Sequence, residues 1–171
     1  MSMKSYESKN RKTPAIHFSW RRILVPIDFS KASLRALDVA VPLGRDHDAR
    51  LILLSVIEPS AYAAGMEGMV ITVPDTTLVK DAKAMLSHIA KKFIPATTSV
   101  TCLVSRGRAF DVITRVAKQK QVDLIVLTTH GRTGINRVLM GSTAERVVRH
   151  ADCPVFVVRP PRLTHRKRGK D

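Results

Sequence analysis

A run of apolar residues that does not alternate with polar ones constrains the fold of this chain most. Residues 124–127 read Leu-Ile-Val-Leu, and Thr128 and Thr129 follow before Gly131 and Gly134. Because apolar side chains point to both sides of such a strand, the run predicts a central strand of a parallel sheet. The glycines after it let backbone N–H groups face a ligand, which is a common way of holding a phosphate.

Four further runs have strand character, and segments of helical periodicity separate them. The runs cover residues 23–28, 50–57, 99–105 and 155–158, and the partly alternating run 99–105 suits an edge strand. Strands that alternate with helices are joined by right-handed crossovers, so they form one parallel sheet with helices on both faces. The sequence therefore predicts a five-stranded, three-layer α/β/α domain.

Helix boundaries carry their own signals. Ser30 is predicted to cap the helix after the first strand, and Pro42 to kink or end that helix near Gly44. Ser142 with Glu145 three residues later has the spacing of a capping box. A helix that starts there would place free N–H groups and a positive dipole end beside the glycine loop.

Ligands of such sheets bind beyond the carboxyl ends of the strands, where strand order reverses. Asp28 ends the run 23–28, and the loop 128–134 leaves the run 124–127. We therefore expect Asp28 and this loop to face each other across one crevice.

Several kinds of nucleotide enzyme are disfavoured. The sequence contains neither G-x-x-x-x-G-K-[ST] nor a G-x-G-x-x-G after the first strand. It also shows no paired acid and base, no nucleophile with an orienting base and no obvious metal cluster. These observations favour a binding protein over a dedicated enzyme.

The charge is concentrated at the two ends of the chain. The net charge is +15, and residues 1–22 and 159–171 each carry six Lys or Arg against a single acidic residue. The expected organisation is a basic flexible leader (1–21), a single domain (22–160) and a basic flexible tail (161–171). Nucleic acid bound through these tails is an alternative, although the chain has only eight aromatic residues for base stacking.

No segment has the roughly 18 apolar residues that a membrane helix needs, and the first twenty residues lack an apolar signal core. A cytoplasmic protein without a membrane partner is expected. Cys102 and Cys153 have no metal-ligand spacing and lie in apolar runs, so buried free thiols are predicted.

From Ile23 to Arg159, 137 of the 171 residues, the chain resembles the universal stress protein family. The resemblance rests on Ile-Leu-Val-Pro-Ile-Asp at 23–28, Thr-His-Gly-Arg-Thr-Gly at 129–134 and Gly-Ser-Thr-Ala-Glu-Arg-Val-Val-Arg-His-Ala-Asp-Cys-Pro at 141–154. The ATP-binding branch of that family carries G-x-x-G-x9-G-[ST]. Gly131, Gly141 and Ser142 match this motif, whereas Thr128 stands at its first glycine.

The resemblance implies strand order 3-2-1-4-5, as in adenine nucleotide alpha hydrolase-like folds, and a site for ATP, ADP or AMP with any Mg²⁺ held mainly by the nucleotide. The implied binding residues are Pro26, Ile27, Asp28, Val56, Leu127, Thr128, His130, Gly131, Arg132, Gly141, Ser142 and Thr143. If Thr128 must adopt positive φ, binding should weaken; if it is extended, its hydroxyl adds a donor.

Other interpretations stay open at this point. Asp28 suits a helix-capping carboxylate near Ser30, and Ser142 suits capping alone. A slow nucleotide hydrolase, or a family member that binds no nucleotide and acts through protein or nucleic-acid contacts of its tails, fits the same residues. The function that we expect is an adenine-nucleotide-binding sensor or regulatory module in stress response.

The run 155–158 predicts a partner. In strand order 3-2-1-4-5 it lies at an edge of the sheet, and it contains no charge or proline that would discourage pairing. A homodimer through antiparallel pairing of this edge follows from both the physical argument and the resemblance.

Overall fold

The structure is a computed structural model that describes residues 19–58, 75–129 and 140–159. The predictions for residues 1–18 of the leader, for His130, Gly131 and Arg132, and for the tail lie outside the described residues. Five strands form one sheet in the order β3-β2-β1-β4-β5, and all four neighbouring pairs are parallel. The strands are β1 (Arg22–Pro26), β2 (Arg50–Ile57), β3 (Val100–Arg106), β4 (Leu124–Thr128) and β5 (Val155–Val158). The predicted fold class and strand order are confirmed.

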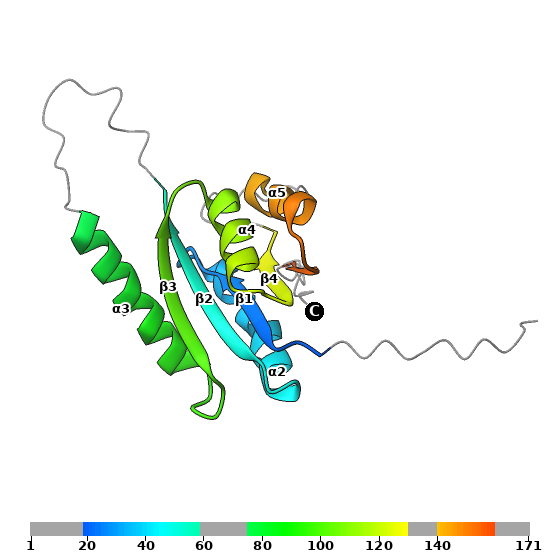
Figure 1. Ribbon diagram of the computed structural model, residues 1–171. Helices are drawn as coiled ribbons and strands as arrows, with labels where there is room; N and C mark the ends of the chain where they lie inside the picture. The colour runs from blue at the N-terminus through cyan, green and yellow to red at the C-terminus, as the bar shows by residue number, and fades with distance from the viewer. Residues whose placement is uncertain (1–18, 59–74, 130–139, 160–171) are drawn as a thin grey trace, which may run out of the picture.

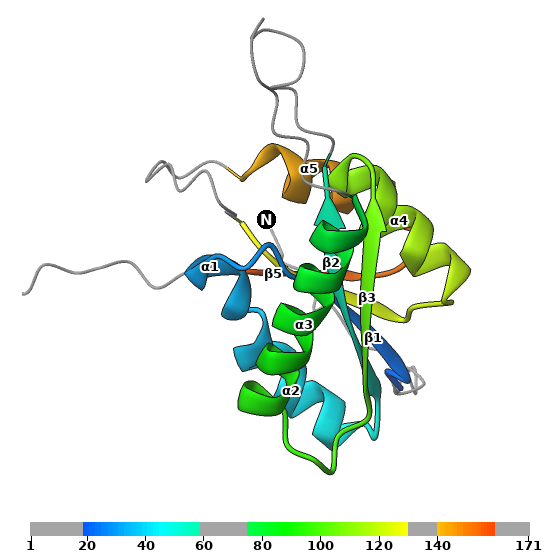
Figure 2. The ribbon, with the colours of Figure 1, turned by 90° about the vertical axis from the view of Figure 1, so that its left-hand side faces the viewer.

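Helices cover both faces of the sheet, as three layers require (Figures 1 and 2). One face carries α1 (Lys31–Leu34), α2 (Leu37–Asp46) and α3 (Asp75–Phe93), and the other carries α4 (Ala109–Gln119) and α5 (Ser142–His150). Figure 2 shows α3 in front of β2 and β3. None of the described helices combines the length and apolar character that crossing a bilayer requires.

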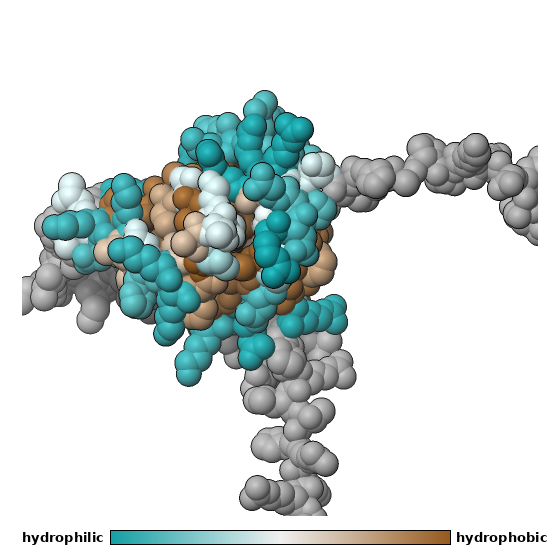
Figure 3. Space-filling view, turned by 90° about the horizontal axis from the view of Figure 1, so that it is seen from below, coloured by the Kyte–Doolittle hydropathy of each residue, from teal (hydrophilic) through white to brown (hydrophobic). Residues whose placement is uncertain are grey.

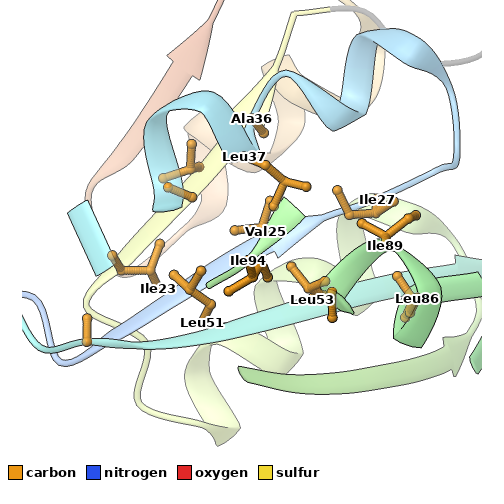
Figure 4. Close-up of a cluster of buried hydrophobic side chains, with 14 of the residues drawn as sticks. Ile23, Val25, Ile27, Ala36, Leu37, Leu51, Leu53, Leu86, Ile89 and Ile94 are labelled. Atoms are coloured by element: carbon orange, nitrogen blue, oxygen red, sulfur yellow. The ribbon is translucent and has the colours of Figure 1, made fainter. Parts of the chain in front are cut away.

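The unalternating apolar runs are explained by two cores, one on each face of the sheet. Ile23 and Val25 of β1 pack under α2 and α3, whereas Leu24 between them packs under α4 and α5. All three are 0% exposed. Figure 4 shows the first core, where Leu37 of α2 and Leu86 of α3 lie against the strands. Burying such side chains is worth about 1.5–3 kcal/mol each, so both faces hold the sheet in place.

Pro42 does not end the helix in which it lies, which corrects one of the two outcomes predicted for it. The helical segment breaks earlier, at Arg35 and Ala36, and α2 then continues past Pro42 to Asp46. Proline removes one intrahelical donor, but the buried residues of α2 hold the helix against the sheet on both sides of it.

The ends of α2 and α4 share one local motif. After α2, Ala49 N–H bonds to Gly44 C=O at 2.8 Å and Asp48 has φ of 49°. After α4, Val122 N–H bonds to Ala117 C=O at 2.9 Å and Gln121 also has φ of 49°. This Schellman arrangement satisfies helix carbonyls at the end of the sheet where the strands begin.

The two cysteines are free, as predicted, but both are half-buried and not buried. Cys102 packs beside the first core and Cys153 beside the second. Burial raises the pKa of both thiols.

Candidate functional site

Asp28 lies just beyond the carboxyl end of β1, where its carboxylate organises the start of α1. Asp28 Oδ1 accepts from Ser30 N–H at 3.0 Å and from the Ser30 hydroxyl at 2.6 Å. Ser30 Oγ in turn accepts from Ser33 N–H at 3.1 Å, so the predicted cap of α1 is confirmed. The Asp28 carboxylate thus makes the contact with Ser30 that the capping interpretation predicted.

Phe29 turns the chain between Asp28 and the helix. Its φ of 66° is in the left-handed region, which is costly for a bulky side chain. Its ring packs against the core between the sheet and α1–α3. Backbone strain of this kind persists only where the surrounding structure enforces it. The left-handed conformation of Phe29 sets the path of the chain between Asp28 and α1.

The carboxyl end of β4 lies beside the start of α5. Thr129 N–H bonds to Val158 C=O at 3.2 Å, and Gly141 N–H bonds to Thr129 C=O at 2.7 Å. Thr129 and Gly141, which flank residues 130–140, therefore lie next to each other. Thr128 is the last residue of β4 and does not have positive φ, so a side chain at the first motif position causes no backbone strain.

The predicted capping box of Ser142 and Glu145 does not form, because the N-cap lies one residue earlier. Gly141 is the N-cap of α5, and its C=O accepts from Glu145 N–H at 2.9 Å. Ser142 is the first residue inside the helix, and among the described residues no side chain caps this end. The Glu145 carboxylate instead bonds to Arg149 at 2.9 Å. The N–H groups of Ser142 and Thr143 make no hydrogen bond to the described residues.

The start of α4 lies at the same end of the sheet, and a carboxylate occupies it. Glu58 directly follows β2, and its Oε1 accepts from Ala109 N–H at 2.6 Å. Gly107 precedes this start with φ of 130°, a conformation that side-chain-bearing residues rarely adopt. The start of α4, which follows β3, is thus capped by a residue that follows the neighbouring strand β2.

A cavity of about 210 Å³ lies between the starts of α4 and α5. The predicted residues Ser142 and Thr143 line it. It is also lined by residues that the sequence did not point to: Glu58, Arg108, Ala109, Phe110 and Arg146. The Arg146 guanidinium stacks 4.8 Å from the centre of the Phe110 ring, which holds this cation beside the cavity.

A simple signal would have pointed to two of the missed residues. Glu58 and Arg108 come after the carboxyl ends of predicted strands, as Asp28 does, and such ends meet at one edge of a parallel sheet.

The remaining predicted residues near the carboxyl ends of the strands differ in how far they are buried. Pro26 and Val56 are half-buried near the ends of their strands. Ile27 and Leu127 are 2% and 4% exposed and belong to the cores, so only their backbones can reach a ligand. Asp28 does not line the 210 Å³ cavity, which lies on the α4–α5 side of the sheet. Within the described residues no group of three or more His, Cys, Asp or Glu could hold a metal ion.

The strand order and the sequence pattern correspond to a known family. A model of the universal stress protein family matches residues 19–159. The chain belongs to the universal stress protein family. The match includes every strand and helix that the structure describes, so the fold and the candidate site both belong to the universal stress protein domain.

Named relatives agree over nearly the whole domain. The chain is 31% identical to universal stress protein MJ0531 of Methanocaldococcus jannaschii over 144 residues, 84% of each protein. Among solved structures, universal stress protein UspA of Lactobacillus plantarum has a TM-score of 0.63 at 33% identity, with 82% of this chain and 98% of that one covered. The structure of MJ0577 has a TM-score of 0.71 at 26% identity, covering 84% of this chain and 98% of that one.

Two more distant structures contain nucleotides. A universal stress protein in complex with cAMP has a TM-score of 0.60 at 22% identity, covering 82% of this chain and 98% of that one. One from Archaeoglobus fulgidus in complex with dAMP has a TM-score of 0.57 at 17% identity, covering 81% and 98%. Both share the fold of this domain.

Proposed function

We propose that this universal stress protein binds an adenine nucleotide, ATP or a related form, at the carboxyl end of its sheet and acts as a regulatory or sensor module in the cytoplasm. Pro26, Asp28 and Val56 would border the adenosine. The phosphates would lie at Gly141, Ser142 and Thr143, with Mg²⁺, where present, held by their oxygens. The architecture is compatible with such ligands, since two proteins of this fold carry cAMP and dAMP.

The observation that carries the proposal is a difference between helix starts at this end of the sheet. Side chains cap α1 and α4, through Ser30 and Glu58 respectively. In the part of the chain that the structure describes, no side chain caps the start of α5, and its Ser142 and Thr143 border a cavity. Uncapped N–H groups at a helix start, with the positive end of the dipole, favour an anion.

Nearby charges support a phosphate in this position. Arg108 and Arg146 line the same cavity, and of the described residues only Glu58 contributes a carboxylate to it. That carboxylate already accepts from Ala109 N–H at 2.6 Å. A cavity of about 210 Å³ is smaller than the roughly 300–1,000 Å³ of whole-ligand pockets, which suits a phosphate group more than a complete nucleotide.

A matched pair of substitutions at Ser142 tests the proposal. Ser142→Pro removes the N–H of the first helical residue, where proline is well tolerated, and the extended Gly141 (φ −62°, ψ 148°) suits a residue before proline. Ser142→Ala keeps the N–H and removes only the hydroxyl. Calorimetric titration with ATP, ADP and AMP then compares both variants with the unaltered protein.

If phosphate oxygens accept from this N–H, Ser142→Pro should weaken ATP binding by at least about tenfold, as expected for a lost hydrogen bond to a charged group. Ser142→Ala should change affinity much less, and AMP should be less sensitive than ATP. Equal ATP affinity in all three proteins would contradict the proposed phosphate position. No heat of binding at millimolar ATP in the unaltered protein would contradict nucleotide binding itself.

We also propose that the protein forms a homodimer through β5. The sheet order leaves β5 at an edge, and its Phe156 is 49% exposed. Val148 of the adjoining α5 is 46% exposed. An edge strand with apolar residues and no inward charge is suited to pairing with a second copy. Phe156→Lys should convert the dimer to a monomer in sedimentation, whereas Phe93→Lys on α3 should not; an unchanged dimer would refute this interface.

A further inference from the structure

A second cavity lies at the opposite end of the sheet, where the strands begin. Its volume is about 250 Å³, and it is lined by Arg22, Arg50, Ile52, Thr101, Leu103, Gln119 and Lys120. It shares no lining residue with the cavity between α4 and α5. Figure 3 views the molecule from this end, where hydrophilic residues surround an apolar area.

The sheet itself brings the cations together. Arg22 of β1 and Arg50 of β2 are register partners in a parallel pair, so their side chains point to the same face. Two residues further along, Leu24 and Ile52 on that face enter the core under α4 and α5. The two arginines therefore lie where the apolar face ends, and Lys120, the C-cap of α4, adds a third cation above them.

Only part of this positive charge has a structural role. Arg22 Nη1 donates to Lys120 C=O at 2.7 Å and to Gln121 Oε1 at 3.2 Å, so this arginine helps to close the end of α4. Toward the described residues Arg50 donates only from Nε, to Ser99 Oγ at 3.2 Å. Within the described ranges, neither Arg22, Arg50 nor Lys120 forms a salt bridge.

Among the described residues, no carboxylate lines the cavity. Asp123 Oδ2 accepts from the backbone N–H groups of Arg21 and Arg22, at 2.9 Å and 2.8 Å, and does not pair with a guanidinium. Asp152 pairs with Lys118 at 3.6 Å. Three like charges around one cavity repel each other, and a bound anion would relieve that repulsion.

We propose that this cavity binds the phosphate group of a small organic phosphate. Arg50 presents the donors of its guanidinium fork, which matches phosphate geometry, and Lys120 adds a point charge. Ile52 and Leu103 give the cavity an apolar wall against which the organic part of a phosphate monoester packs. The proposal is independent of nucleotide binding at the carboxyl end, because the two cavities share no residue.

The test uses the full chain, with inorganic phosphate and phenyl phosphate as probes and backbone amide chemical shifts as the readout. The expected result is saturable shifts at Thr101, Gln119 and Lys120, with tighter binding of phenyl phosphate than of inorganic phosphate. Equal affinity for the two probes would overturn the assignment to an organic phosphate. Shifts confined to Ser142 and Thr143, or none at millimolar probe, would overturn the cavity as a phosphate site.

Charge variants separate a defined site from general attraction of anions. Arg50→Gln and Lys120→Gln should each raise the dissociation constant of phenyl phosphate about tenfold, the loss expected for one charged hydrogen bond. Lys118→Gln removes the same charge two residues away, outside the cavity, and should change it less than twofold. An equal effect of all three substitutions would refute a specific site. Arg22 is left unaltered because it closes the end of α4.

Discussion

The two ends of the sheet satisfy their backbone polar groups in different ways. Where the strands begin, α2 and α4 end in the same Schellman arrangement, and Arg22 donates to the carbonyl of Lys120. Where the strands end, Ser30 and Glu58 cap α1 and α4, but no side chain of residues 19–58, 75–129 or 140–159 caps α5.

This difference follows from the direction of the strands. In a parallel sheet with helical crossovers, helix starts gather at the carboxyl ends of the strands and helix ends gather at the other edge. An anion at the carboxyl end is attracted by backbone N–H groups and helix dipoles. At the opposite edge helix carbonyls point outward, so affinity for an anion must come from side-chain cations such as Arg50 and Lys120.

The largest expected effect is a loss of folding stability from a substitution in the core, because both ends of the sheet depend on that core. Leu54 is 0% exposed and lies in the core under α4 and α5. Leu54→Ala should lower the free energy of unfolding by about 2–5 kcal/mol, measured by urea denaturation. Met85→Ala, at a position 48% exposed, should stay within about 0.5 kcal/mol. A loss below 1 kcal/mol at Leu54 would contradict the packing described for this core.

A charge change at the carboxyl end should separate the two binding sites. Arg146→Gln removes a cation from the cavity beside α5 and should weaken ATP binding about tenfold in calorimetry. Arg149→Gln is the matched control, because Arg149 is paired with Glu145 at 2.9 Å and does not line the cavity. Phenyl phosphate binding at the opposite end should be unchanged in both variants. Equal weakening of ATP binding by both would assign the effect to net charge.

A smaller effect is expected from the backbone strain at Phe29. Since φ is 66° at this position, Phe29→Gly should be more stable than Phe29→Ala by about 1 kcal/mol, although both lose the packing of the ring. Thermal or urea unfolding of the two variants measures the difference. Alanine as stable as glycine would show that the left-handed conformation at Phe29 costs nothing.

The smallest effect concerns the thiols. Burial raises the pKa of Cys102 and Cys153, and the Asp123 and Asp152 carboxylates raise the pKa of Cys153 further. The thiolate, which is the reactive form, should therefore be scarcer than in a free cysteine, and alkylation rates should keep rising above pH 9.0. Asp152→Asn should lower the pKa of Cys153 and speed its alkylation, while Cys102 stays unchanged. A rate that levels off below pH 9.0 would contradict the raised pKa values.

The architecture could be predicted from the sequence because it depends on patterns that extend over many residues. Apolar runs without alternation required helices on both faces, and Ile23, Leu24 and Val25 show the reason by packing alternately into the two cores. Ser30 was predicted as a cap from one local signal, and its hydrogen bond to Ser33 N–H confirms it.

Details that depend on a single residue could not be predicted in the same way. Gly141 and Ser142 both suit an N-cap, so the sequence could not exclude a shift of one residue. Pro42 lies within α2 because the packing of that helix outweighs the lost donor. The contact of Glu58 with Ala109 joins residues 51 positions apart and depends on the strand order. Of the charged residues that line the α5 cavity, Glu58 and Arg108 follow strands and could have been found from that position, whereas Arg146 lies inside α5 and carries no such signal.

Amide chemical shifts during titration of the unaltered protein with ATP test the central claim most directly. Saturable shifts should appear at the carboxyl end, at Asp28, Val56, Ser142 and Thr143, while Arg50 and Thr101 at the other end respond only at higher concentration. Shifts confined to Arg50, Thr101 and Lys120, with Ser142 and Thr143 unchanged at saturation, would contradict the assignment of the nucleotide to the uncapped start of α5.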